Sequence, residues 1–325
     1  MAKQLILTTF ASVKTVILHE TTRLDSGCVA TIGCFDGVHL GHRLLIDMVM
    51  QKAKERGLLS AVITFDRQPR EVFDPDFRPQ LLSTQREKSE IIASLGVDLL
   101  VVLPFTKELA NLSAQVFMQQ VLHDRLNVSV LIVGYDHRFG HNRTESFDDY
   151  VCYGKALGIE VLRGDVAYFP REEKAVSSSV IRQLLMEGRV ETMQEILSRP
   201  YSVTGKVVQG EHIGHELGFP TANIEVYDPN KIIPAAGVYA VWAMIGSERQ
   251  AAMMNIGMRP TFQGKQQTLE VHILNNKVGD MYGQTLTVEF VERLRSERRF
   301  NTREDLMEQL WQDREKTLSC LKVKP

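Results

Sequence analysis

Cysteine is scarce in this sequence, and its charges are evenly balanced. Four cysteines occur in 325 residues and no two form a Cys-x-x-Cys pair, which excludes a disulfide scaffold and a cysteine-based zinc site. The sequence contains 38 Lys and Arg residues and 40 Asp and Glu residues. Up to Met186 there are 21 basic and 22 acidic residues, which leaves 17 and 18 beyond it. Neither half has the basic excess of a nucleic-acid-binding protein.

Long apolar runs are also missing. The stretch from Leu99 to Leu103 is far shorter than the roughly 20 apolar residues that a membrane-spanning helix needs. The N-terminus carries no cleavage-site pattern of a secretory signal. With 44% hydrophobic residues, the chain is too apolar to be disordered. We expect a folded cytoplasmic protein with reduced thiols and without nucleic-acid or membrane partners. These features leave its oligomeric state open.

The length predicts two domains. In the first part, short β-branched runs alternate with helical patterns, and Gly57, Gly96 and Gly158 follow predicted helices, as expected of left-handed helix ends. The predicted strands cover residues 29–32, 61–65, 99–103, 130–133 and 159–162, and the predicted helices cover 44–55, 86–95, 113–124 and 147–157. This alternation predicts an α/β fold with a doubly wound parallel sheet, whose ligands bind beyond the carboxyl ends of the strands.

The pattern changes beyond Ser178. Residues 180–186 and 191–197 predict two short helices, and a last helix is predicted from about Thr302. The strands between them alternate between apolar and polar residues, which predicts an antiparallel β-barrel with a C-terminal helix. We expect the buried positions to be Val238, Ala240 and Trp242, then Leu269, Val271 and Ile273, then Leu286, Val288 and Phe290. The predicted division is a doubly wound domain over residues 1–186, a helical linker over 187–200 and a barrel domain over 201–325.

The segment from Gly33 to His42, here called the Gly–His segment, lies between a predicted strand and a predicted helix. The N-terminus of a helix offers unpaired N–H groups to an anion, and Gly41 lets a phosphate approach the backbone. His39 and His42 lie about one turn apart and place two imidazoles on one side. The segment lacks the Gly-Lys-Ser/Thr of a Walker loop and the Gly-x-Gly-x-x-Gly of a dinucleotide fold. Each histidine alone is also compatible with a simple strand-to-helix turn.

A second group of residues combines hydroxyls with an arginine. Ser178 and Ser179 stand at the start of a predicted helix and Arg182 follows in its first turn. Hydroxyls at a helix start and a guanidinium fork can both bind phosphate oxygens. Taken alone, the same pattern describes a serine-capped helix with an arginine on the surface.

The Gly–His segment resembles the His-x-Gly-His nucleotidyltransferases. Its amino-acid sequence is similar to that of the FMN adenylyltransferase module of bifunctional riboflavin kinase/FAD synthetases. Residues 134–140 and 176–182 resemble two further elements of that module. The resemblance implies transfer of AMP from ATP to FMN, with His39 and His42 as the catalytic pair. It also implies nucleotide or flavin contacts from Gly33, Phe35, Asp36, Gly41, Asp136, Ser178, Ser179 and Arg182.

The barrel half carries glycines, hydroxyl and amide side chains, and a carboxylate. Glycines in 205–210 and 214–218 allow backbone amides to close around phosphates. Pro220 precedes Thr221 and Asn223, whose oxygens suit Mg²⁺. Leu269 and Val271, the neighbours of Glu270 on its predicted strand, point to the core. The Glu270 carboxylate therefore faces the other side, where it can accept a proton from an alcohol. A solvent-facing charge is the alternative for a lone Glu.

Five segments of this half resemble the riboflavin kinase module, at residues 218–223, 255–262, 270–274, 280–283 and 294–297. The resemblance implies a Greek-key barrel that phosphorylates riboflavin with ATP as co-substrate. Thr221 and Asn223 would bind Mg²⁺ and phosphate, and Glu270 would act as the base toward the ribityl hydroxyl. Contacts with nucleotide or flavin are implied for Gly205, Gly214, Gly218, Pro220 and Arg295.

Both resemblances together predict a bifunctional enzyme that binds riboflavin, FMN, FAD and ATP. The sequence departs from the family pattern at Arg67-Gln68, His137, Ser179 and His215, where Pro-His, Phe, Thr and Arg are usual. The first two departures lie near the expected crevice of the first domain. They leave open a kinase whose first domain is inactive or has another specificity. A non-catalytic flavin-binding regulator is the second alternative.

Overall fold

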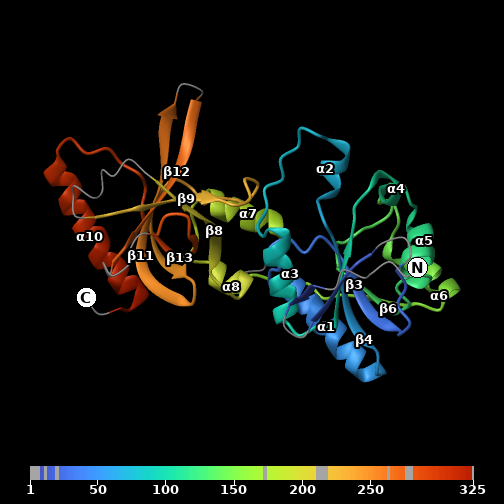
Figure 1. Ribbon diagram of the computed structural model, residues 1–325. Coiled ribbons are helices and arrows are strands. Elements are labelled where there is room, and N and C mark those ends of the chain that lie inside the picture. Colours follow the sequence, from blue (N-terminus) through green and yellow to red (C-terminus); the bar gives the residue numbers. More distant parts are fainter. Residues whose placement is uncertain are drawn as a thin grey trace. The chain divides into compact units, whose positions relative to one another are not determined.

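The computed structural model describes residues 8–10, 13–18, 22–170, 174–209, 219–261, 264–274 and 281–323. The chain forms two compact units, Met1–Ser178 and Ser179–Pro325 (Figure 1). The first unit contains a parallel α/β sheet and the second a closed antiparallel barrel. The predicted fold class is confirmed.

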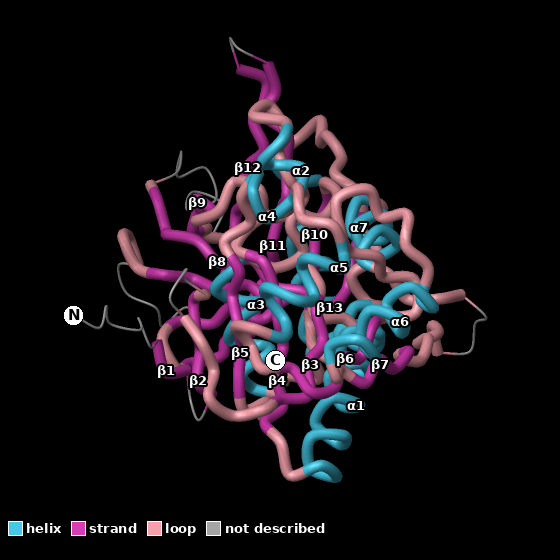
Figure 2. The backbone as a smooth tube through the Cα atoms, turned by 90° about the vertical axis from the view of Figure 1, so that its right-hand side faces the viewer, coloured by secondary structure: helices cyan, strands magenta, loops and turns pink. Residues whose placement is uncertain are grey.

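The sheet of the first unit has the strand order β1-β2-β5-β4-β3-β6-β7, and Figure 2 shows β5, β4, β3, β6 and β7 side by side in that order. The strands are β1 (Thr8–Phe10), β2 (Val13–Ile17), β3 (Cys28–Ile32), β4 (Leu59–Phe65), β5 (Leu99–Leu103), β6 (Val128–Val133) and β7 (Glu160–Arg163). All pairs are parallel except β1 with β2. Five of the strands were predicted; β1 and β2 were not.

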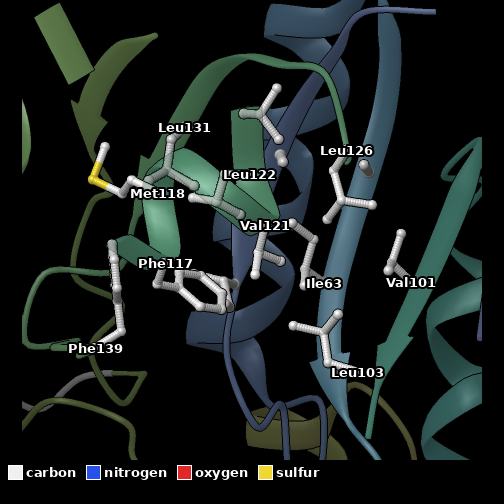
Figure 3. Close-up of a cluster of buried hydrophobic side chains, with 14 of the residues drawn as sticks. Ile63, Val101, Leu103, Phe117, Met118, Val121, Leu122, Leu126, Leu131 and Phe139 are labelled. Atoms are coloured by element: carbon white, nitrogen blue, oxygen red, sulfur yellow. The ribbon is translucent and has the colours of Figure 1, made fainter. Parts of the chain in front are cut away.

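Helices cover both faces of this sheet. The helices of the first unit are α1 (Leu40–Arg56), α2 (Pro69–Phe73), α3 (Gln85–Ser94), α4 (Lys107–Ala110), α5 (Ala114–Phe117), the π-helix η1 (Met118–His123) and α6 (Phe147–Leu157). Buried residues of α1 and α3 pack against one set of strand residues. Those of α5, η1 and α6 pack against the alternate set. In Figure 3, Phe117 and Val121 lie near Ile63 and Leu103. The result is a three-layer α/β/α unit.

Most of the predicted helix ends agree with the structure within two residues because local backbone chemistry sets them, but α1 begins at Leu40, four residues before its predicted start at 44. Gly57 and Gly158 follow α1 and α6 with φ of 65° and 72°, in the left-handed region that glycine tolerates. Thr84 and Ser146 begin α3 and α6 with reciprocal capping hydrogen bonds. The helix predicted over 113–124 is divided into α5 and a π-helical turn, η1.

The barrel of the second unit closes in the order β10-β11-β12-β9-β8-β13. Its strands are β8 (Tyr201–Val208), β9 (Ala222–Val226), β10 (Gly237–Ile245), β11 (Glu248–Thr261), β12 (Gly264–Ile273) and β13 (Thr285–Arg295). Each of its pairings is antiparallel. The short helices α7 (Ser178–Met186) and α8 (Met193–Leu197) precede the barrel, and α10 (Arg303–Leu321) follows it.

One predicted face of the barrel needs correction. Leu269, Val271 and Ile273 are paired with the buried residues Ile256, Met254 and Ala252, as expected of the interior. On β10, however, Ala240 and Trp242 pack in the cluster that includes Leu318 and Leu321 of α10. The interior positions of β10 are Tyr239, Val241 and Ala243, of which the latter two pair with Phe290 and Val288. Because α10 covers the outside of β10, this strand is apolar on both faces, and alternation alone cannot distinguish them.

Candidate functional site

The Gly–His segment lies at the carboxyl end of β3, where a parallel sheet binds its ligands. His39 is the residue before α1, and its Nδ1 accepts a hydrogen bond from the backbone N–H of His42 at 3.4 Å. The two imidazoles are stacked, with ring centroids 3.6 Å apart and planes inclined by 19°. Because Nδ1 of His39 accepts, its ring proton must be on Nε2 and can be donated elsewhere. A Cβ on Gly41 would approach the His39 ring to 3.3 Å, so this glycine makes room for the histidine.

The backbone of the segment is strained. Phe35 and Val38 have φ of 50° and 41°, in the left-handed region that non-glycine residues rarely adopt, and Gly37 between them has φ of 81°. Such residues cost on the order of 1–3 kcal/mol each and persist only where their surroundings hold them. Both side chains are buried. The fold therefore stabilises this backbone conformation at a cost, as is typical of preorganised sites.

Asp36 supplies much of that stabilisation. Its carboxylate accepts hydrogen bonds from the backbone N–H groups of Leu82 and Ser83, both at 3.0 Å. The hydroxyl of Ser83 accepts from the N–H of Gly37 at 2.9 Å, and the hydroxyl of Ser178 donates to the carbonyl of Asp36 at 2.9 Å. Asp36 thus connects the Gly–His segment to the start of α3. Its predicted contact with nucleotide stays a prediction.

His42 is half-buried in an electropositive environment. Burial, together with the nearby His39, His137 and Lys88, lowers the pKa of His42 well below its usual value of 6.5. The ring is therefore neutral at pH 7. Its Nδ1 atom is buried and has no hydrogen-bond partner among the described residues. A buried polar atom of this kind suits a hydrogen bond to a bound phosphate.

An apolar pocket of about 310 Å³ opens beside the segment, at the ends of β3, β4 and β6. Aromatic and aliphatic residues make up most of its wall, namely Ile32, Phe65, Phe73, Phe105, Leu109, Leu112, Phe117 and Phe139. Basic and imidazole side chains share its lining, namely Arg70, Arg138, Arg143, His137 and His141. Such a pocket fits a ligand that combines a flat apolar ring system with anionic groups. The Tyr150 hydroxyl holds the wall by bonding both the N–H and the carbonyl of Phe139 at 3.0 Å.

His137, which stands where the family usually has Phe, lines this pocket. Burial, reinforced by Arg143, lowers the pKa of His137 to about 4. The unfolded chain takes up this proton near pH 6.5 and the folded chain only near 4, so folding stability from this group is present above pH 6.5 and lost as pH falls toward 4. We expect about 2 kcal/mol of the free energy of unfolding to be lost at pH 5 through His137.

Replacing His137 by Phe should remove this part of the pH dependence. Urea unfolding at pH 7 and pH 5 measures it, and the variant should lose less stability between the two than the unmodified protein. His141→Phe, an exposed histidine on the same loop, is the matched control and should retain the original dependence. An equal loss in His137→Phe and in the unmodified protein would contradict the argument.

The remaining predicted residues of the first site include Asp136, Ser179 and Arg182. Asp136 is exposed on the loop after β6. Ser179 and Arg182 follow Ser178 in the first turns of α7, and Arg182 is half-buried. The structure thus brings His39, His42 and Asp36 together. The contacts of the remaining residues with a ligand stay predictions.

In the barrel, Glu270 lies in a row of polar residues that crosses three strands. It pairs directly with Asn223 on β9 and with Asn255 on β11. Residues directly opposite one another in an antiparallel sheet point to the same face. Since the neighbours Leu269 and Val271 point into the barrel, this row lies on its outer face. The predicted orientation of Glu270 agrees with this arrangement, and Asn223 is brought beside it.

His272, two residues after Glu270, ties this row to the preceding loop. Its Nδ1 lies 2.8 Å from the carbonyl oxygen of Pro220, immediately before Thr221. Phe219 packs between the rings of His272 and Trp311, with centroid distances of 5.0 and 5.2 Å. Burial lowers the pKa of His272, so the neutral ring donates to Pro220 through Nδ1–H. This contact positions the chain that leads to Thr221.

Two predicted residues of the barrel have structural partners. The Arg295 guanidinium bonds the fully buried Asp313 of α10, with Nη2 and Oδ2 2.8 Å apart. Gly205 lies within β8, where a Cβ would come within 2.3 Å of the carbonyl oxygen of Glu225. These contacts explain both residue types without a ligand, so their predicted contacts stay predictions. Gly214, Gly218 and His215 lie outside the described residues.

No cluster of three or more His, Cys, Asp or Glu side chains that could hold a metal occurs in the described part of the chain. None of its helices is long and apolar enough to span a membrane.

Sequence reasoning missed three residues at these sites. Asn255 and His272 lie inside the motifs that resemble the riboflavin kinase module. Pairing the strands would have placed Asn255 beside Glu270 and His272 near Pro220. Lys88, buried under the Gly–His segment, has no sequence signal because it looks like an ordinary helix lysine.

Comparisons with known proteins agree with both halves of the chain. Residues 21–180 match the FAD synthetase family and residues 197–321 match the riboflavin kinase family. A bifunctional riboflavin kinase/FMN adenylyltransferase from Haemophilus influenzae is 36% identical over 91% of this chain and 95% of its own length. One from Bacillus subtilis is 35% identical over 89% and 91%.

A solved structure of a macrolide-efflux protein from Streptococcus pneumoniae has a TM-score of 0.85 at 30% identity, and the match covers 93% of this chain and 98% of that one. This likeness concerns the fold. The two family matches follow one another along the chain in the order of the two folds. The chain belongs to the family of bifunctional riboflavin kinase/FMN adenylyltransferases.

Proposed function

We propose that the two reactions of the family are divided between the two units, with the site residues named above. The chain is a transferase that phosphorylates riboflavin to FMN and adenylylates FMN to FAD, with ATP as co-substrate. The first unit carries out adenylylation and the barrel carries out phosphorylation. The observation that carries this assignment is the stacked His39–His42 pair beside an apolar pocket in one unit and the Glu270–Asn223 pair in the other.

In the adenylylation step the attacking group is the phosphate of FMN, which is already ionised. The protein therefore needs no base; it needs positioning and stabilisation of the charge that develops on pyrophosphate. His39 and the N-terminus of α1 offer donors for that charge, and the buried Nδ1 of His42 offers a further hydrogen-bonding atom. The apolar pocket would hold the flavin ring, with Arg138 or Arg143 toward its phosphate.

In the phosphorylation step the attacking group is a neutral hydroxyl. A carboxylate at Glu270 can accept its proton, and the row of Asn223 and Asn255 can orient the reacting groups. This difference between the attacking groups explains why one unit presents imidazoles and the other a carboxylate.

Mg²⁺ fits the barrel site as a shared ligand of protein and nucleotide. Magnesium keeps several waters and takes only one or two protein oxygens besides substrate phosphates. The Thr221 hydroxyl and the Asn223 amide oxygen, which flank the start of β9, would supply such oxygens. When bound, the ion neutralises charge on the transferred phosphoryl group. We further propose that the protein acts in the cytoplasm, where ATP is available.

Incubation with riboflavin and ATP, followed by chromatographic separation of FMN and FAD, tests this function. With Mg²⁺ we expect FMN first and then FAD; after removal of divalent cations with EDTA, both products should fall by at least about 100-fold. Restoring Mg²⁺ is the control. FMN without FAD would instead favour a kinase with an inactive or differently specific first domain. Neither product would favour a flavin-binding regulator.

A further inference from the structure

Lys88 of α3 is a buried cation that the proposed chemistry does not use. Lys88 is 8% exposed, and its Nζ donates to the carbonyl oxygens of Cys34 at 3.1 Å and Phe65 at 3.0 Å. Cys34 belongs to the Gly–His segment and Phe65 is the last residue of β4. The ammonium group thus joins two neighbouring strands where they end, directly beneath the proposed nucleotide site.

The neighbourhood shows why this contact matters for the strained backbone. The Cys34 carbonyl, which also accepts from the Thr64 hydroxyl at 3.3 Å, immediately precedes Phe35 with its positive φ. The Asp36 carboxylate holds the other side of Phe35. Lys88 and the residues that bind the Asp36 carboxylate lie within one short stretch, 82–88. This stretch holds the Gly–His segment at two successive points.

The choice of a charged donor requires a further reason. Two carbonyl oxygens could be joined by a neutral amide, and burying an ammonium group carries a large desolvation cost. Burial indeed lowers the pKa of Lys88, while Asp36 and Asp66 oppose that shift. A positive charge below a segment that binds a polyphosphate stabilises the anion, and in a buried site this effect is weakly screened.

We propose that Lys88 is a positioning residue for FMN adenylylation: it fixes the entry of the Gly–His segment and contributes positive charge beneath the bound phosphates. It touches no substrate. The inference rests on the proposed division of activities. It adds Lys88, which belongs neither to the His39–His42 pair nor to the lining of the apolar pocket.

The test compares full-length Lys88→Met with the unmodified protein. We expect kcat for FAD formation from FMN to fall about 10- to 100-fold, as for other displacements of a catalytic group. The KM for FMN should change less than about threefold because Lys88 itself does not line the apolar pocket. FMN formation from riboflavin should be unchanged, which shows that the rest of the chain is folded. Arg86→Met, which removes an 82% exposed cation from the same helix, should affect neither activity.

Two further measurements separate positioning from simple stability. Lys88→Arg keeps the charge and should recover most of the lost kcat, and it replaces Lys88→Met if that variant fails to fold. The imidazole pKa of His42, measured by NMR, should rise in Lys88→Met, because the charge of Lys88 adds to burial in lowering it. An unchanged kcat in folded Lys88→Met would overturn the proposal, as would Lys88→Arg with a kcat as low as that of Lys88→Met. If the unmodified protein forms no FAD, the proposed function fails instead.

Discussion

Replacing His42 by Ala should lower the rate of FAD formation from FMN by about 10²–10³-fold, the usual cost of losing one donor to a developing anion. The physical reason is the position of this ring, which stacks on His39 at the N-terminus of α1 and presents a buried Nδ1 with no hydrogen-bond partner in the described ranges. FMN formation from riboflavin should keep its rate because the barrel has its own site. Steady-state assays of the two reactions, each started from its own flavin substrate, measure both effects in one preparation.

His123→Ala provides the control for this variant. His123 is an exposed residue at the end of η1, so its loss should leave both rates unchanged. Equal loss of both activities in His42→Ala would contradict the division between the units. A normal rate of FAD formation would remove His42 from the catalytic assignment.

Glu270→Gln should have the opposite effect on the two activities. We expect FMN formation to fall about 10²–10⁴-fold, the range that a general base contributes, because an amide cannot accept the hydroxyl proton. The Gln side chain has nearly the same shape, so the pairing with Asn223 and Asn255 should remain. FAD formation should be unaffected when FMN is supplied. The same two assays give the result.

Glu248→Gln is a suitable control because Glu248 is an exposed carboxylate at the hairpin between β10 and β11. It should retain both activities. If Glu270→Gln phosphorylates riboflavin at the original rate, Glu270 is only the solvent-facing charge that its strand pattern also allows. A loss of both activities would show that the two sites depend on each other.

The two motifs were predictable because their chemistry is local in the sequence. The residues that bring His39 and His42 together are neighbours in the sequence, because a glycine-containing turn leads directly into a helix, and the structure stacks their rings. Strand alternation likewise placed Glu270 on the face of its strand that points away from the side chains of Leu269 and Val271. The same rule misplaced the interior of β10, where Ala240 and Trp242 pack under α10. A pattern along one strand reports burial, and it does not report which neighbour buries the residue.

Arg295 and Gly205 show a second limit. Both residue types are typical of binding sites, and each has a structural partner far away in the chain, Asp313 for Arg295 and Glu225 for Gly205. Nothing in the spacing of residues along the chain shows such partners.

The sequence by itself determined the two fold classes, most of the helix ends and the family, because periodicity, capping residues and contiguous motifs are properties of neighbouring residues. Only the tertiary structure decided what holds the Gly–His segment in its strained conformation. Asp36 finds its donors at residues 82 and 83, and Lys88 reaches the carbonyls of Cys34 and Phe65, through the packing of α3 against the sheet. A buried charge is stabilised by groups that folding brings within 3 Å or so of it, and those groups are distant in sequence.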